Sequence, residues 1–157
     1  MINDAFFILG FYGPILIGLI GAGVLWSNTW FLVVYLLSIL GNVGVNKILK
    51  LSIRDPRPTK TGGLSSVVDT ASSYSGEEKW GMPSGHAQTS FFCITFLFLY
   101  NESVELAMGL GSLAFLTLLQ RWTNKRHTVA QLVVGSIVGI AVANMAFYVG
   151  KLTADTS

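Results

Sequence analysis

The residues of this chain that could do chemistry are two histidines and three basic side chains that the sequence pattern places near them. The histidines are His86 and His127, and the cations expected beside them are Lys50, Arg57 and Arg121. Guanidinium and ammonium groups donate charge-assisted hydrogen bonds that suit phosphate oxygens. Two histidines with a phosphate between them supply a nucleophile and a general acid. The set therefore predicts phosphoryl chemistry.

A predicted helix start beside His86 adds a second anion-binding feature. Pro83, Ser84 and Gly85 lead into a long apolar segment. A helix N-terminus presents free backbone N–H groups and a partial positive charge, so it attracts anions. Proline suits the first turn, glycine lets a ligand approach closely, and serine adds a hydroxyl donor. We expect Ser84 and the Gly85 backbone to bind phosphoryl oxygens.

The basic residues and the histidines also have a structural interpretation. Basic residues at the ends of membrane spans commonly extend to the interface or set orientation, and we keep this interpretation for Lys60, Lys125 and Arg126. A single interfacial histidine is more often structural than catalytic. Two histidines and three cations at the ends of separate apolar segments favour a functional site instead.

The residue types disfavour a metal centre. Zinc sites take three or four Cys, His or carboxylate ligands, whereas this chain has two histidines and one cysteine, Cys93, which lies inside an apolar run. No paired carboxylates flank the histidines at the spacing of calcium or magnesium ligands. We expect neither a metal nor another cofactor.

The composition places this chemistry in a membrane. Of 157 residues, 52% are hydrophobic and 11% are charged, whereas about 25% of an average globular domain is charged. So few charged groups cannot cover a soluble surface, and such an apolar chain is not a disordered one. The net charge of +2 is too small to indicate nucleic-acid binding.

Five stretches are apolar enough to be membrane helices, since about 20 apolar residues span a bilayer. They cover residues 5–26, 30–50, 84–100, 103–120 and 127–152, the third and fourth being short. We predict a single all-α domain over residues 1–157: a polytopic, integral membrane helix bundle with about five transmembrane helices. Short connections make successive spans alternate in direction. The segment ends that carry Lys50, His86, Arg121 and His127 then meet at one end of the bundle, called the motif end here.

One long polar segment, about residues 52–82, also belongs to the motif end. It is rich in Ser, Gly and Thr, and a loop of that length in a small chain is commonly functional; a lid and a simple tether are both open interpretations. All ten Lys and Arg residues except Lys151 lie at this end, which the positive-inside rule would make cytoplasmic. Three of them are the expected phosphate ligands, so the side of the membrane stays open.

Three short motifs resemble those of the type 2 phosphatidic acid phosphatase (PAP2) superfamily of membrane lipid phosphatases. The first is Lys, six residues, then Arg-Pro. The second is Pro-Ser-Gly-His. The third is Ser-Arg, a His after five further residues, and an Asp after three more. Here the motifs stand at Lys50 to Pro58, at Pro83 to His86, and at Gln120-Arg121, His127 and Gln131, so that glutamines occupy the Ser and Asp positions of the third.

Within that superfamily the chain is most similar to the dolichyl-diphosphatase branch. The branch has Asn-x-Gly-Val-Asn before its Lys, as at residues 42–46. It also has Gly-Met-Pro-Ser-x-His-x-Gln, as at residues 81–88, and His-Thr-x-x-Gln, as at residues 127–131. The resemblance therefore covers residues 42–131, and it makes the glutamine at position 131 a feature of the branch.

The resemblance implies a metal-independent hydrolysis in two steps. His127 would attack phosphorus and form a phosphohistidine. His86 would protonate the leaving group and then activate water. The phosphoryl oxygens, and the charge that develops on them, would be held by Lys50, Arg57, Arg121, Ser84 and the Gly85 backbone.

Gln131 is expected to orient His127. It lies four residues later, hence on the same helix face, and its amide oxygen can accept a hydrogen bond from the imidazole N–H as an Asp would. A glutamine lacks the negative charge that stabilises an imidazolium. On this basis Gln131→Asp is expected to keep or raise activity.

The predicted substrate is a lipid whose phosphate or diphosphate head lies at the interface while its tail stays among membrane lipids. A polyprenyl, dolichyl-type diphosphate follows from the resemblance, and the composition does not distinguish it from phosphatidate. Two other functions stay open: a non-enzymatic membrane scaffold of the same fold, and phosphoryl transfer to an acceptor other than water. No nucleic-acid partner is expected, and the oligomeric state is not predicted.

Overall fold

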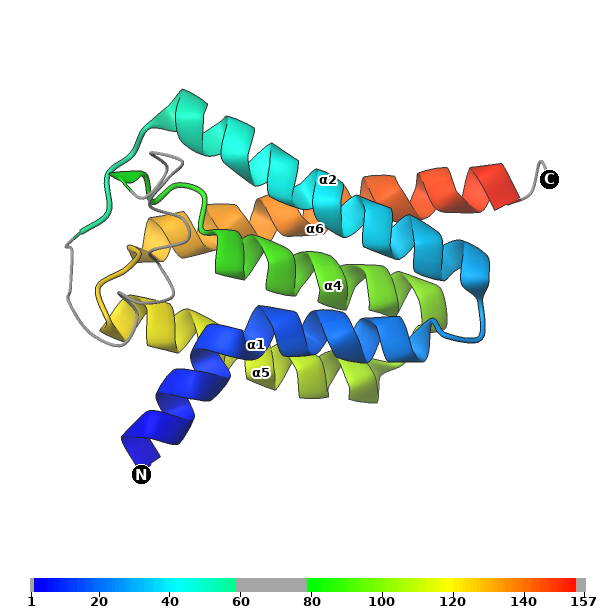
Figure 1. The fold of residues 1–157 in the computed structure, drawn as a ribbon, viewed down its shortest axis with the longest axis horizontal. Coiled ribbons are helices and arrows are strands. Elements are labelled where there is room, and N and C mark those ends of the chain that lie inside the picture. The colour runs from blue at the N-terminus through cyan, green and yellow to red at the C-terminus, as the bar shows by residue number, and fades with distance from the viewer. Residues whose placement is uncertain (1, 59–78, 155–157) are drawn as a thin grey trace.

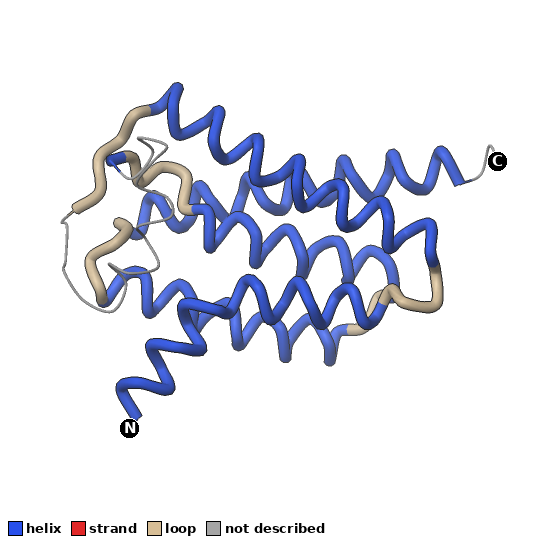
Figure 2. Tube along the Cα trace, in the orientation of Figure 1, coloured by secondary structure: helices blue, strands red, loops and turns tan. Residues whose placement is uncertain are grey.

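The computed structural model describes residues 2–58 and 79–154. Within them the chain forms helices α1 (Ile2–Val24), α2 (Thr29–Ile53), α4 (Gly85–Asn101), α5 (Val104–Thr123) and α6 (Val129–Ala154). The helices lie side by side and alternate in direction (Figures 1 and 2). This confirms the predicted all-α bundle, and each helix end lies within three residues of its expected place. The lid or tether expected before Trp80, with Lys60, falls almost entirely outside the described residues.

Three of these helical segments are long and apolar enough to cross a membrane: Phe6–Val24 within α1, α2 and α6. The outer surface fits a lipid environment, because large apolar side chains such as Leu40, Phe115 and Met145 are mostly exposed. Backbone groups satisfied within helices are what a spanning segment requires. Both features indicate a multi-pass membrane protein.

The central helix of the bundle is α4, which packs against α1, α2, α5 and α6. Its core side chains include Phe92, Phe96, Leu97 and the expected buried cysteine, Cys93. It has 17 residues, which at 1.5 Å each is about 26 Å, less than the roughly 30 Å of a hydrocarbon core. Because its neighbours shield it from lipid, α4 can be short and can carry buried polar residues.

Two glycines let α6 pack closely on α4. A Cβ at Gly135 would overlap the backbone oxygen of Ser84, and a Cβ at Gly139 would overlap that of Gln88. The spacing of four residues puts both glycines on one face, a pattern that brings membrane helices close together. The contact sets the start of α6 against the start of α4, where the motif residues lie.

Helix α1 is bent. Pro14 lies inside it and has no N–H to donate to the carbonyl of Gly10, which favours a kink at this turn. The first turns of α1 diverge from the other helices, whereas the rest of α1 runs along the bundle (Figure 1). The residues just before Pro14 therefore lie where α1 meets the motif end.

We expect Gly139→Ala to lower the free energy of unfolding by about 1–3 kcal/mol, the usual cost of overpacking, because the backbone of Gln88 cannot move aside. Gly109→Ala is the matched control, since a Cβ at this exposed glycine of α5 meets nothing within 4 Å and alanine favours a helix. Thermal unfolding in detergent measures both. A midpoint for Gly139→Ala at or above the wild-type value would contradict the packing argument.

Candidate active site

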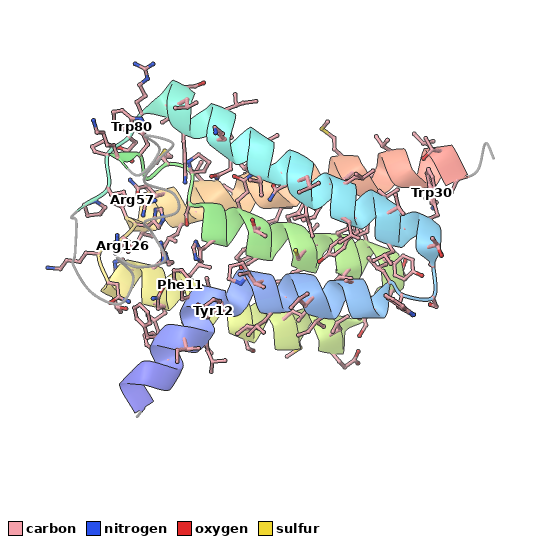
Figure 3. The ribbon with its side chains drawn as sticks, in the orientation of Figure 1. Phe11, Tyr12, Trp30, Arg57, Trp80 and Arg126 are labelled. Carbon is pink, nitrogen blue, oxygen red and sulfur yellow. The ribbon has the colours of Figure 1, made fainter. Side chains whose placement is uncertain are left out.

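The structure brings the predicted site residues together at the motif end of the bundle. Lys50 lies in the last turn of α2 and Arg121 in the last turn of α5. Ser84 is the N-cap of α4, His86 follows in its first turn, and Gln131 lies in the first turn of α6. Figure 3 shows Arg57 and Arg126 at this end and Trp30 at the opposite end.

The segment that follows α2 is held against the approach to α4. Arg54 ends α2 in the left-handed region, with φ of 54°, and its N–H donates to the carbonyl of Lys50 at 3.1 Å. Beyond it, Arg57 N–H donates to Lys79 O at 3.2 Å, and Gly81 N–H donates to Asp55 O at 2.7 Å. These bonds place the backbone around Arg57 beside the segment that leads to Ser84.

The turn between α5 and α6 folds His127 back over Arg121. The backbone N–H groups of Arg126 and His127 donate to the carbonyl of Arg121 at 3.0 and 3.3 Å, and Lys125 adopts a left-handed φ of 52°. His127 and Arg121 are each only 2% exposed. A buried imidazole and a buried guanidinium thus share the centre of the site.

Hydrogen bonds of Gln131 determine the tautomer of His127. Gln131 Oε1 accepts from the backbone N–H of Thr128 at 3.2 Å, and Gln131 Nε2 donates to the carbonyl of Pro56 at 3.0 Å. A backbone N–H can only donate and a carbonyl can only accept, so the amide has one possible orientation. His127 Nδ1 lies 3.1 Å from Oε1 and must carry the proton. The lone pair is therefore on Nε2.

The buried residue Gln131 also joins three parts of the chain. Its Nε2 donates to Asp55 Oδ2 at 2.6 Å, and its backbone carbonyl accepts from Ser84 N–H at 3.0 Å. Gly81 covers the amide so closely that a Cβ there would overlap it. Gln131 thereby links α6 to the segment after α2 and to the start of α4.

Positive charge surrounds both imidazoles. Burial lowers the pKa of His127 well below its ordinary value, the charges of Arg121, Arg57 and Lys50 lower it further, and the hydrogen bond with Gln131 opposes them more weakly. His86 lies in the field of the same three cations. At neutral pH His127 is therefore the free base, the form that can act as a nucleophile.

Phe11 of α1 contacts two site residues. Its ring centroid lies 5.4 Å from that of His86, and the Arg121 guanidinium carbon lies 5.7 Å from the same ring, within the range of a cation–π contact. Phe11 was not predicted from the sequence, because no motif falls in α1 and the helix is apolar on every side. It is the contribution of α1 to the site.

Among the buried side-chain atoms that have no hydrogen-bond partner in the described residues, two uncharged ones lie at the motif end. They are Ser84 Oγ and Gln120 Oε1. An unpaired buried hydroxyl is costly, so Ser84 Oγ is suited to bind a ligand oxygen, as its place in the second motif implies. Gln120 instead lies against α1, where a Cβ at Gly10 would overlap its side chain. The glutamine therefore belongs to the contact between α1 and α5.

A network of buried amides ties α2 to α4 next to the site. Asn46 Nδ2 donates to Gln88 Oε1 at 2.7 Å and to Pro83 O at 3.2 Å. Gln88 Nε2 donates to the backbone and side-chain oxygens of Asn42, both at 2.8 Å. The three amide side chains are buried. They hold the last turns of α2, which carry Lys50, against the helix start that carries Ser84.

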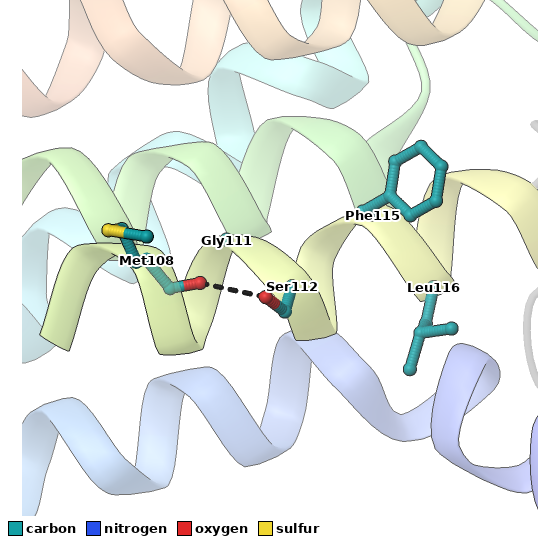
Figure 4. Close-up of a pocket in the computed structure, with 5 residues that line it drawn as sticks. All are labelled: Met108, Gly111, Ser112, Phe115 and Leu116. Atoms are coloured by element: carbon teal, nitrogen blue, oxygen red, sulfur yellow. Dashed lines mark hydrogen bonds between the residues drawn. The ribbon is translucent and has the colours of Figure 1, made fainter. Parts of the chain in front are cut away.

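Neither a metal-binding cluster nor the groove on α5 forms a second chemical centre in the described structure. No group of three His, Cys, Asp or Glu side chains that could hold a metal occurs in residues 2–58 and 79–154. A groove on α5 is lined by Met108, Gly111, Ser112, Phe115 and Leu116 (Figure 4). The Ser112 hydroxyl donates to Met108 O of the same helix at 3.0 Å. The groove is thus part of the apolar outer surface.

Comparison with known proteins decides the family. The sequence pattern described as the PAP2 superfamily matches residues 31–153. The chain belongs to the PAP2 superfamily. This membership, with the three helices that can cross a membrane, confirms the predicted multi-pass membrane protein.

This PAP2 protein is similar to several dolichyldiphosphatases. Dolichyldiphosphatase 1 of Homo sapiens is 34% identical over 62% of this chain and 44% of its own length. The proteins of the same name from Rhinolophus ferrumequinum and Callithrix jacchus are 34% and 35% identical over 71% of this chain and 50% of their own lengths. The chain thus spans about half the length of the curated relatives it matches. No solved structure matches it significantly.

A carboxylate that was not predicted from the sequence stands near the third PAP2 motif, behind Gln131. Gln131 occupies the Asp position of the third motif, and the carboxylate behind it comes from Asp55 of the first motif. Asp55 is the only acidic residue within the three motif segments. That isolation is the signal that could have identified it.

We expect the pKa of His127 to lie below 6.5, the ordinary value for histidine, because burial and three cations disfavour the charged form. The neutral form then persists as the pH falls through 6.5 and is lost only at the lower pKa of the folded protein. NMR titration of histidine-labelled protein in detergent, assigned with a His86→Gln variant, measures the midpoint. A midpoint at or above 6.5 would contradict the charge arrangement.

Proposed function

We propose that this chain hydrolyses the phosphate or diphosphate head of a membrane lipid, with a polyprenyl diphosphate of the dolichyl type as the first substrate to consider. One observation carries the proposal: the free-base Nε2 of His127 lies among Arg121, Arg57 and Lys50 at the end of an apolar helix bundle. A cationic site beside a lipid-facing surface suits an anionic head with an apolar tail. The similarity to dolichyldiphosphatases supports the diphosphate.

In the first step His127 Nε2 attacks the terminal phosphorus, and a P–N bond forms as the P–O bond to the leaving group breaks. The bridging oxygen takes the electron pair and a proton from His86, which carries that proton when the negative head group of the bound substrate offsets the neighbouring cations. A lipid monophosphate leaves. The three cations, the Ser84 hydroxyl and the first N–H groups of α4 stabilise the charge on the equatorial oxygens. His127 becomes positively charged and keeps its proton on Nδ1, bonded to Gln131.

In the second step water hydrolyses the phosphohistidine. His86, now neutral, takes a proton from the water, whose oxygen attacks phosphorus. The P–N bond breaks, its electron pair returns to His127 Nε2, and inorganic phosphate leaves. Both histidines end in their starting forms, and no metal enters either step.

The proposed function is tested by measuring the release of phosphate from a polyprenyl diphosphate in detergent, with EDTA present throughout. We expect His127→Ala to abolish release and His86→Ala to lower it by about 10²–10⁴-fold, the usual contribution of a general acid. Lys151→Ala, which removes an exposed charge at the opposite end of α6, is the control and should leave release unchanged. Thermal unfolding confirms that each variant is folded.

The alternatives give different outcomes in the same experiment. Preferential turnover of phosphatidate would assign a phosphatidic acid-type phosphatase. Recovery of the phosphate on an added alcohol rather than as inorganic phosphate would indicate transfer to another acceptor. Binding of these lipids by folded protein without any turnover would contradict the proposal and favour the non-enzymatic scaffold.

A further inference from the structure

We infer that Asp55 is a positioning residue for His127 and acts on it through the amide of Gln131. The inference rests on the proposed function, in which His127 is the nucleophile. Three side chains form one line of hydrogen bonds: His127 Nδ1 to Gln131 Oε1 at 3.1 Å, and Gln131 Nε2 to Asp55 Oδ2 at 2.6 Å. Asp55 and Gln131 are 76 residues apart in the sequence.

The direction of this line is fixed by backbone groups. Thr128 N–H holds the oxygen of the Gln131 amide, and the carbonyl of Pro56 holds its nitrogen. The His127 proton therefore points toward Oε1 and the amide hydrogen points toward the carboxylate. Hydrogen bonds in such a chain polarise one another, so negative charge on Asp55 makes Oε1 a better acceptor.

The stabilisation of His127 by Asp55 grows when His127 reacts. As Nε2 bonds to phosphorus, the imidazole becomes positive, and its proton on Nδ1 binds more strongly to an oxygen that is polarised by a carboxylate. Asp55 thus stabilises the charged intermediate without touching substrate. Gln131, which is neutral, supplies the connection, and Asp55 supplies the charge.

Asp55 is held in place for this role. It is half-buried, its carbonyl accepts from Gly81 N–H at 2.7 Å, and it stands between the left-handed Arg54 and the rigid Pro56. Both Gly81 and Pro56 also contact the Gln131 amide. The residues that hold the backbone of Asp55 are therefore also residues that hold the amide of Gln131.

The position of Asp55 reverses one expectation from the sequence. Gln131→Asp was expected to keep or raise activity, but in the structure it would set a second carboxylate against that of Asp55 without a hydrogen between them. Like charges at hydrogen-bond distance destabilise each other. We therefore expect the single substitution to lower activity.

The test compares four proteins: wild type, Asp55→Asn, Gln131→Asp, and the double variant. Asp55→Asn keeps an acceptor oxygen and removes the charge, so kcat for lipid diphosphate hydrolysis should fall while KM stays unchanged. We expect a fall of about 10–100-fold, by analogy with the loss of the partner behind a metal-bound histidine. The double variant places the carboxylate directly on His127 and an amide behind it. It should recover most of the kcat that either single variant loses.

The matched control is Glu105→Gln, which makes the same chemical change at the opposite end of the bundle and should leave kcat unchanged. A purely structural role for Asp55 would lower the unfolding midpoint, raise KM together with lowering kcat, and give no recovery in the double variant. Any such result overturns the inference. So does an Asp55→Asn variant with wild-type kcat.

A second readout does not depend on catalysis. The NMR midpoint of His127 should be lower in Asp55→Asn than in wild type, because the imidazolium loses a stabilising negative charge. The charged or titratable groups that act on His127 from the other elements stay the same in both proteins: Lys50, Arg57, His86 and Arg121. If the wild type hydrolyses no lipid, the proposed function fails. The comparison of NMR midpoints still decides whether Asp55 acts on His127, and an unchanged midpoint in Asp55→Asn rejects the inference.

Discussion

The buried amide of Gln131 is the interaction on which the rest of the site depends. Its oxygen faces the backbone N–H of Thr128 and its nitrogen faces the carbonyl of Pro56, and neither group can exchange donor for acceptor. The backbone fold therefore determines which nitrogen of His127 carries the lone pair. The same amide binds Asp55, and the backbone carbonyl of Gln131 binds the N-cap of α4. The proposed nucleophile, the carboxylate and the predicted phosphate-binding residues are therefore all positioned by Gln131.

Two kinds of contact between helices, both suited to a membrane protein, position the helices that carry the site. Lipid tails are as apolar as a leucine side chain, so burial alone does not specify how membrane helices associate. Close backbone contact at Gly135 and Gly139 sets α6 on α4, and the buried amides of Asn42, Asn46 and Gln88 set α2 on α4. The central, short α4 is thus positioned from both sides, which brings Lys50, Ser84 and Gln131 to one end.

The charges at the motif end are arranged for an anion. Arg121 is buried, and its charge, with those of Arg57 and Lys50, lowers the pKa of His127. The same cations that keep His127 neutral would bind phosphoryl oxygens in the proposed reaction. Asp55 adds one negative charge on the far side of Gln131, where it can stabilise His127 without competing with the substrate.

The amino-acid sequence by itself determined the all-α membrane fold, the helix bounds and the end at which the motif residues meet, because apolar runs of about 20 residues and short turns leave few arrangements. It also indicated that Gln131 would face His127, since residues four apart share a helix face. Only the tertiary structure decided that Asp55 stands behind Gln131, that Phe11 contacts His86 and Arg121, and that Gln120 packs against α1. These contacts join separate segments, and a membrane helix that is apolar on every side, such as α1, carries no stripe to say which face meets its neighbours.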